Sequence, residues 1–128
     1  MRVLLDTHAL LWATLDPASL SRKAARVIVD PKNDILVSAA SAWEIATKVR
    51  LGRLPGAERL EREVLETMEA AGYTLVPIST EVALRAGRFA TEHRDPFDRV
   101  IAAQALHEDI PVLSADTMLD SFLVTRIW

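Results

Sequence analysis

Short apolar runs alternate along this chain with longer stretches in which apolar side chains recur every three or four positions. The short runs are apolar at consecutive positions and rich in β-branched residues, which is typical of strands covered on both faces of a sheet. We therefore predict five strands, at Val3–Leu5, Ile35–Ser38, Leu75–Ile78, Val112–Ser114 and Val124–Ile127.

Helical patterns fill the spaces between these strands. The clearest follows Ala57, where Leu60, Val64 and Met68 share one stripe and Gly72 is the expected C-terminal cap. Alternating elements predict an α/β fold in which a five-stranded, mostly parallel sheet is flanked by helices on both faces. The predicted helices are His8–Leu15, Arg22–Val29, Ala42–Leu51, Ala57–Ala71, Glu81–Thr91 and Phe97–Glu108.

Four carboxylates fall where this arrangement places the carboxyl edge of the sheet. Asp6 and Asp116 follow predicted strands, Glu44 lies in the helix after another strand, and Asp98 starts a helix that leads to the next strand. Ligand sites in parallel sheets open at this edge. Because four clustered carboxylates repel one another unless cations lie among them, the pattern indicates a site for a hard ion such as Mg²⁺ or Mn²⁺.

Each acid also has a structural explanation. Ser41 and Glu44 have the spacing of a capping box, and Asp95 followed by Pro96 predicts a capped helix start. Asp116 is placed to cap a short helix. Capping alone does not require acids to gather at one edge of one sheet, so the metal interpretation accounts for more of the pattern.

Composition narrows the class of protein. The 128 residues suit one domain, and 50% apolar with 26% charged residues is typical of a globular protein. The chain has no cysteine, and its three histidines lack paired ligand spacing, which disfavours zinc. We expect neither a signal peptide nor a membrane span, and hence a cytoplasmic protein.

The charge pattern suggests a local basic rim. A net charge of −3 argues against coating of nucleic acid by phosphate neutralisation alone. Basic residues nevertheless lie close in sequence to two of the acids, and we consider them as substrate contacts: Lys48, Arg50, Arg94 and Arg99.

Large apolar side chains in the first helix exceed what one helix face can bury. Leu11, Trp12 and Leu15 are therefore candidates for an interface as well as for the core. We interpret Trp43 and Trp128 as packing residues.

Four segments, at Leu4–His8, Ser41–Ile45, His93–Ala105 and Leu113–Asp116, carry a family resemblance. In this order they resemble the PIN-domain nucleases, and specifically the VapC-type toxins of bacterial toxin–antitoxin modules. The resemblance extends over nearly the whole chain and implies a single PIN domain over residues 1–128.

The resemblance implies metal-dependent cleavage of RNA, with Mg²⁺ or Mn²⁺ as cofactor, inhibition by a cognate antitoxin, and a homodimer. Asp6, Asp98 and Asp116 would hold metal, and Glu44 would orient or deprotonate the attacking water or share a metal. The supporting residues would be Thr7, Ser41 and Asp95. The expected antitoxin contacts are Leu11, Trp12, Leu15, Leu51 and Leu54.

Three other functions share part of the pattern. A Mg²⁺-binding signalling domain of the receiver type needs an aspartate after its third strand, where this chain has Ser79 and Thr80. A haloacid-dehalogenase-like phosphatase needs two aspartates separated by one residue, where this chain has Asp6 and then His8. A non-catalytic PIN-like RNA-binding domain would not need all four acids.

Overall fold

A single parallel sheet forms the centre of the molecule in the computed structural model, which describes all residues from 1 to 128. The strand order is β3-β2-β1-β4-β5, and all four neighbouring pairs are parallel. The predicted α/β class is confirmed, and the predicted strand ends lie within two residues of the observed ones. The strands are β1 (Arg2–Leu5), β2 (Asp34–Ser38), β3 (Thr74–Val76), β4 (Val112–Leu113) and β5 (Arg126–Ile127).

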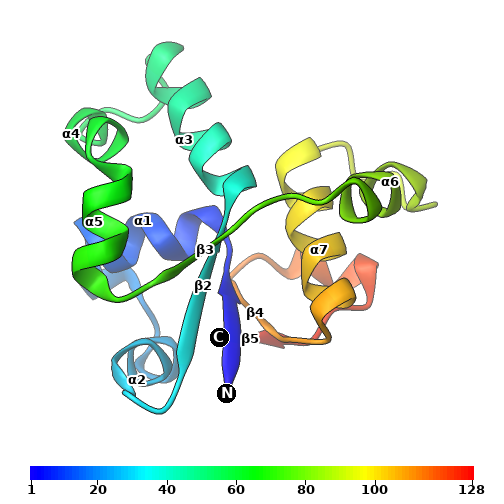
Figure 1. The fold of residues 1–128 in the computed structure, drawn as a ribbon, viewed down its shortest axis with the longest axis horizontal. Coiled ribbons are helices and arrows are strands. Elements are labelled where there is room, and N and C mark those ends of the chain that lie inside the picture. The colour runs from blue at the N-terminus through cyan, green and yellow to red at the C-terminus, as the bar shows by residue number, and fades with distance from the viewer.

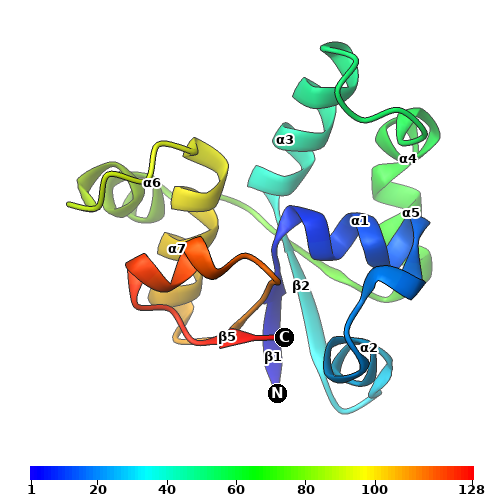
Figure 2. The same ribbon diagram turned by 180° about the vertical axis from the view of Figure 1, so that it is seen from behind.

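Helices cover both faces of this sheet (Figures 1 and 2). On one face lie α1, α2, α4 and α5, and on the other lie α6 and α7, while α3 rises from the carboxyl end of β2 (Figure 1). Two 3-10 helices, Pro17–Ser19 and Thr117–Phe122, complete the chain. The α-helices are α1 (Thr7–Leu15), α2 (Arg22–Val29), α3 (Ala39–Arg50), α4 (Glu58–Arg62), α5 (Val64–Ala71), α6 (Thr80–Arg88) and α7 (Pro96–Glu108).

The hydrophobic core has two layers because successive side chains of a strand point to opposite faces. Val3 and Leu5 pack with α1, α2, α4 and α5, whereas Leu4 and Leu36 pack with α7. Leu4, Leu5 and Leu36 are no more than 1% exposed. Burial of each such side chain contributes roughly 1.5–3 kcal/mol, so the central strands are held firmly from both sides.

One predicted helix is divided in two. The stretch from Ala57 to Ala71 breaks at Glu63, which lies outside helical geometry between α4 and α5. Leu60 and Met68 still face the core, so the predicted apolar stripe is confirmed. The prediction of one continuous helix is wrong. No glycine or proline marks the break, which is why periodicity could not reveal it.

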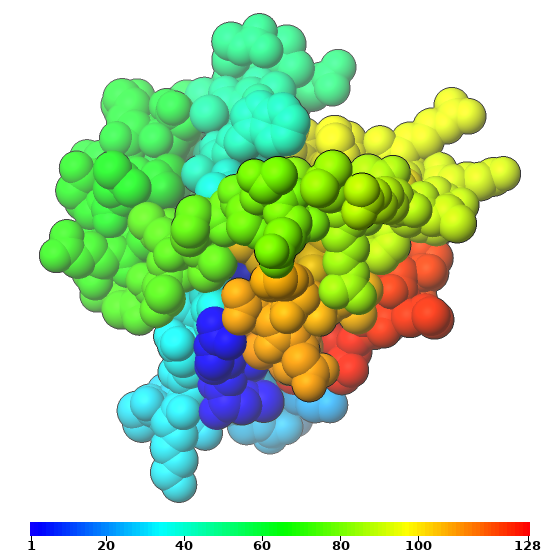
Figure 3. All heavy atoms as spheres, turned by 45° about the vertical axis from the view of Figure 1, so that its right-hand side comes forward, coloured from blue at the N-terminus to red at the C-terminus, as the bar shows by residue number.

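The connection from β3 to α6 crosses the surface of α7, as Figure 3 shows for the green segment in front of the orange helix. Gln104 of α7, which is 1% exposed, donates from Nε2 to the Pro77 carbonyl at 3.0 Å. This hydrogen bond ties the crossing segment to the helix that carries Asp98.

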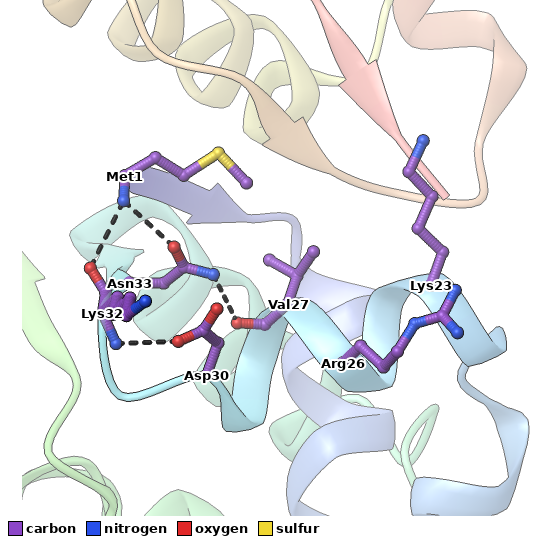
Figure 4. A pocket seen from close by; sticks show the side chains of 7 residues that line it. All are labelled: Met1, Lys23, Arg26, Val27, Asp30, Lys32 and Asn33. Atoms are coloured by element: carbon purple, nitrogen blue, oxygen red, sulfur yellow. Dashed lines mark hydrogen bonds between the residues drawn. The ribbon is translucent and has the colours of Figure 1, made fainter.

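The amino edge of the sheet is closed by a hydrogen-bonded turn (Figure 4). The ammonium of Met1 donates to Asn33 Oδ1 at 3.0 Å, and Asn33 Nδ2 donates to the Val27 carbonyl at 2.9 Å. These contacts hold the turn before β2 in place, beside a hollow of about 410 Å³. None of the helices combines the length and apolar character needed to cross a bilayer.

Candidate active site

The four acids singled out from the sequence all lie at the carboxyl edge of the sheet. Asp6 follows β1 and caps α1, while Asp116 follows β4 and caps a 3-10 helix. Glu44 lies in the second turn of α3, directly above β2. Asp98 is the third residue of α7, which starts at this edge because it leads to the amino end of β4.

Asp6 is held on both carboxylate oxygens. Oδ1 accepts from the Ala9 amide at 2.7 Å, and Oδ2 accepts from the hydroxyl of Ser114. The same hydroxyl accepts from the Asp116 amide at 3.0 Å, so Ser114 links two of the acids. Burial raises the pKa of Asp6 above its usual value; the Ser114 and Ala9 hydrogen bonds and the charge of His8 oppose the shift, and the charge of Asp116 adds to it.

Ser114 was not identified from the sequence as a site residue. It is fully buried, and it directly follows β4, although the prediction counted it as the last residue of this strand. A hydroxyl at the end of an otherwise apolar run was the available signal, because a buried hydroxyl needs a hydrogen-bond partner.

Glu44 is 3% exposed and forms an ion pair through Oε2 with Lys48, one turn later in α3. The capping-box alternative is wrong, because Ser38 caps this helix by accepting from the Ala40 amide at 3.0 Å. The predicted start at Ala42 is therefore three residues late, since the helix begins at Ala39.

Ser41 consequently lies inside α3, where it is fully buried. Its hydroxyl shares a hydrogen bond of 3.0 Å with the hydroxyl of Thr7 in α1. This contact joins the beginnings of the two helices that follow β1 and β2, and so connects the elements that position Asp6 and Glu44.

Asp98 lies beside a histidine that the sequence did not indicate. Asp95 caps α7 as predicted, accepting from the Phe97 amide at 2.9 Å. The Asp98 Oδ2 atom is 3.0 Å from Nε2 of His93. Burial and the neighbouring charge of Asp95 raise the pKa of Asp98 to about 6, with Glu44 adding to the increase and His93 opposing it.

The acids influence one another in two pairs: the charge of Asp116 adds to the raised pKa of Asp6, and the charge of Glu44 adds, less than that of Asp95, to the raised pKa of Asp98. The structure does not bring three carboxylate or histidine side chains within ligating distance of one point. The donors are nevertheless the hard oxygens that Mg²⁺ and Mn²⁺ prefer, and burial raises the pKa of Asp6 and of Asp98 although local hydrogen bonds oppose the increase. A hollow of about 310 Å³ opens beside one pair, lined by Asp6, His8, Trp12, Ala115 and Asp116.

The predicted substrate cations have different surroundings. Lys48 pairs with Glu44, whereas Arg50 and Arg94 are exposed and form no ion pair. Arg99 does not extend to a surface site. Its guanidinium donates to four backbone carbonyls, at 2.7 to 3.1 Å, and so organises the segment between α6 and α7. The carbonyls belong to Ala86 (2.9 Å), Phe89 (2.7 Å), Thr91 (3.1 Å) and His93 (2.8 Å).

The predicted antitoxin contacts differ in how much surface they offer. Leu11 is 8% exposed within the core, and Leu54 is half-buried against the same core, so these two offer less surface to a partner, and the five contacts stay predictions. Trp12 is half-buried, and the centroid of its ring lies 5.5 Å from that of Trp128. Leu15 and Leu51 remain exposed.

Comparisons with known proteins agree with the fold. The family model described as PIN domain matches residues 3–122. Ribonuclease VapC16 of Mycobacterium tuberculosis (strain ATCC 25618 / H37Rv) is 43% identical over 65 residues, which cover 51% of this chain and 45% of that protein. The match thus spans less than half the length of that curated relative.

Solved structures match along almost the whole chain. VapBC2 from Rickettsia felis, bound to a promoter DNA fragment, has a TM-score of 0.72 at 13% identity, covering 99% of this chain and 98% of that one. Mycobacterium tuberculosis VapC20, described as a Sarcin-Ricin loop cleaving toxin, has a TM-score of 0.69 at 14% identity, with 98% of both chains covered. At these identities the likeness establishes the fold.

The observed strand order also differs from the order 2-1-3-4-5 of receiver-type domains.

The raised pKa of Asp98 predicts a pH-dependent stability. Between about 4 and about 6 the folded chain holds more protons than the unfolded chain, so the free energy of unfolding falls as pH rises through this window. In chelator at pH 7, Asp98→Asn should raise the free energy of unfolding by on the order of 1–3 kcal/mol and flatten this slope. Urea denaturation at several pH values measures both effects.

The control is Glu66→Gln, which removes an exposed acid from α5 and should leave the slope unchanged. If Asp98→Asn retained the wild-type pH dependence, the burial of Asp98 would not be the source of the slope.

Proposed function

This chain belongs to the PIN-domain family, and on that premise we propose that it is a divalent-metal-dependent endoribonuclease and the toxin of a toxin–antitoxin module. The observation that carries this proposal is the gathering of Asp6, Asp116, Glu44 and Asp98 at one sheet edge, with the pKa of Asp6 and of Asp98 raised. The ribonuclease name of the matched relative supports RNA as the substrate class.

Asp6, Asp98 and Asp116 would hold Mg²⁺ or Mn²⁺, directly or through water, with Glu44 as a further ligand or as the group that receives the proton of the attacking water. When bound, the cation supplies neutralisation of the phosphate charge and a lowered pKa for the attacking water. Carboxylate oxygens are the donor type that these ions select.

The remaining residues of the site would fix these acids in place. Ser114 orients Asp6 by its hydroxyl, and the Thr7–Ser41 hydrogen bond holds α1 against α3. Lys48 forms an ion pair with Glu44 and so holds this carboxylate in place within the first turns of α3. These contacts leave Glu44 and Asp6 little rotational freedom, so the reacting groups are positioned before substrate binds.

Cleavage of RNA should require a divalent cation and Asp98. We expect purified protein to cleave total cellular RNA with Mg²⁺ or Mn²⁺ and to lose this activity in excess chelator. Asp98→Asn should abolish cleavage with the fold intact, because it removes a charge from the metal ligands. Asp95→Asn, three residues away, should retain most of the rate because asparagine caps a helix about as well as aspartate.

Gel analysis with mapped cleavage positions measures the activity and identifies the sites cut. Undiminished cleavage in chelator would exclude the metal mechanism. Metal-dependent cleavage that survives Asp98→Asn but not Asp95→Asn would overturn the assignment of the α7 acid. RNA binding without any cleavage would favour the non-catalytic PIN-like alternative.

The proposal includes a cognate antitoxin and a homodimer as protein partners. Relatives that share the fold include toxin–antitoxin complexes, such as VapBC-1 from nontypeable Haemophilus influenzae, with a TM-score of 0.67 at 15% identity over 99% of this chain and 97% of that one. Trp12 lines the hollow beside Asp6 and Asp116, so a segment that blocks these acids would contact its indole. A basic side chain of that segment would pair with the carboxylates.

Trp12→Ala should weaken binding of the product of a neighbouring antitoxin gene by on the order of 1–3 kcal/mol, because it removes an aromatic anchor. RNA cleavage by the free variant should be largely retained. Binding titrations measure the loss, and Val29→Ala, which truncates a 75% exposed side chain on α2, is the control. Unchanged affinity in a folded Trp12→Ala variant would assign this tryptophan to the core or to the homodimer.

A further inference from the structure

Two aromatic side chains that the proposed chemistry leaves unused lie between the beginnings of α3 and α7. Trp43 directly precedes Glu44 in α3, and Phe97 directly precedes Asp98 in α7. The centroids of the two rings are 4.6 Å apart, and their planes meet edge to face at 72°. The rings thus bridge the two helices that carry one pair of acids.

Trp43 does not behave as the packing residue that the sequence suggested. It is 54% exposed, whereas Glu44 beside it is 3% exposed. Consecutive residues of a helix point about 100° apart, so the buried acid and the exposed indole occupy adjacent faces of one helical turn. Burial of an indole is favourable, so the exposed face of Trp43 beside a buried acid is apolar surface that a ligand at this edge could cover.

The size of the apolar surface fits a small planar ligand. Trp43 is the one large apolar residue of α3 and α7 that is exposed. A stable protein interface covers about 800 Å² on each partner, far more than this aromatic pair presents. A single nucleobase, in contrast, needs one aromatic ring on which to stack.

Two exposed arginines on the same chain segments also suit a nucleic acid. Arg94 lies three residues before Phe97, and Arg50 ends α3 about two turns beyond Trp43; both are exposed and neither forms an ion pair. Unpaired guanidinium groups bind phosphates, while stacking is sequence-tolerant because every base has a π-face.

We infer that Trp43, supported edge to face by Phe97, stacks against an unpaired base of the RNA that enters the carboxylate edge. This inference rests on the proposed function and adds to it a named base-stacking residue that directly precedes Glu44. A base that stacks on the indole must be free of its duplex partner, so the contact selects unpaired bases.

The test measures binding apart from cleavage. A fluorescently labelled single-stranded RNA hexanucleotide is titrated, in chelator, with the full chain carrying Asp98→Asn, and its anisotropy is recorded. Adding Trp43→Leu should weaken binding on the order of 10- to 100-fold, the loss expected for one stacked base. Trp43→Phe, which keeps a ring, should stay within about 3-fold of the parent. Leu65→Ala, which truncates a 68% exposed residue of α5, should have no effect.

A second measurement retains Trp43 and so does not depend on the folding of its variants. In a chain carrying Trp12→Phe and Trp128→Phe, the fluorescence of Trp43 should be quenched by the hexanucleotide. An abasic oligonucleotide of the same length should not quench it, because the abasic chain has phosphates but no ring.

Equal affinity of the Trp43→Leu chain, or equal quenching by the abasic chain, would overturn the stacking site while leaving the nuclease proposal intact. The same holds if Trp43→Leu changed only the sedimentation of the protein, since the patch would then be a contact between copies. Failure of every chain, including the parent, to bind RNA would count against the proposed function as well.

Discussion

Parallel pairing of β1 with β2 and with β4 is the constraint on which the rest of the structure depends. It sends three chain segments out of the core at the same edge, and each segment carries an acid within its next few residues. The crossover through α7 returns the fourth acid to that edge. The hydrophobic contacts of Leu4, Leu5 and Leu36 hold these strands from both faces. Their stabilisation of the fold offsets the free-energy cost of burying carboxylates at the sheet edge.

The four carboxylates do not share one common partner. Each of three acids has its own partner: Asp6 accepts from Ser114 and Ala9, Glu44 pairs with Lys48, and Asp98 lies against His93, although these contacts offset the cost of burying Asp6 and Asp98 only in part. Local donors of this kind explain how a fold can accommodate four carboxylates at one edge without losing its stability. The proposed function requires that a cation compete with these donors, so the same contacts would tune metal affinity and the pH range of activity.

Patterning along the chain was sufficient for the strands, the parallel order and the edge at which the acids gather, because these follow from burial and from alternation of elements. It was insufficient for contacts between distant segments. Nothing local distinguishes Ser38 from Ser41 as the cap of α3, and nothing near Ser114 or His93 specifies an acid partner. Arg99 and Trp43 show the limit most clearly, since the first is an arginine used within the fold and the second a tryptophan left at the surface.

The central claim is that this sheet edge holds a divalent cation among its carboxylates. Anomalous diffraction from crystals grown with Mn²⁺ above pH 7, where Asp98 is ionised, tests it directly. The account predicts an anomalous peak ligated by oxygens of Asp6 and of Asp98 or Asp116. A peak elsewhere, or none at all, in crystals of protein that cleaves RNA would contradict it.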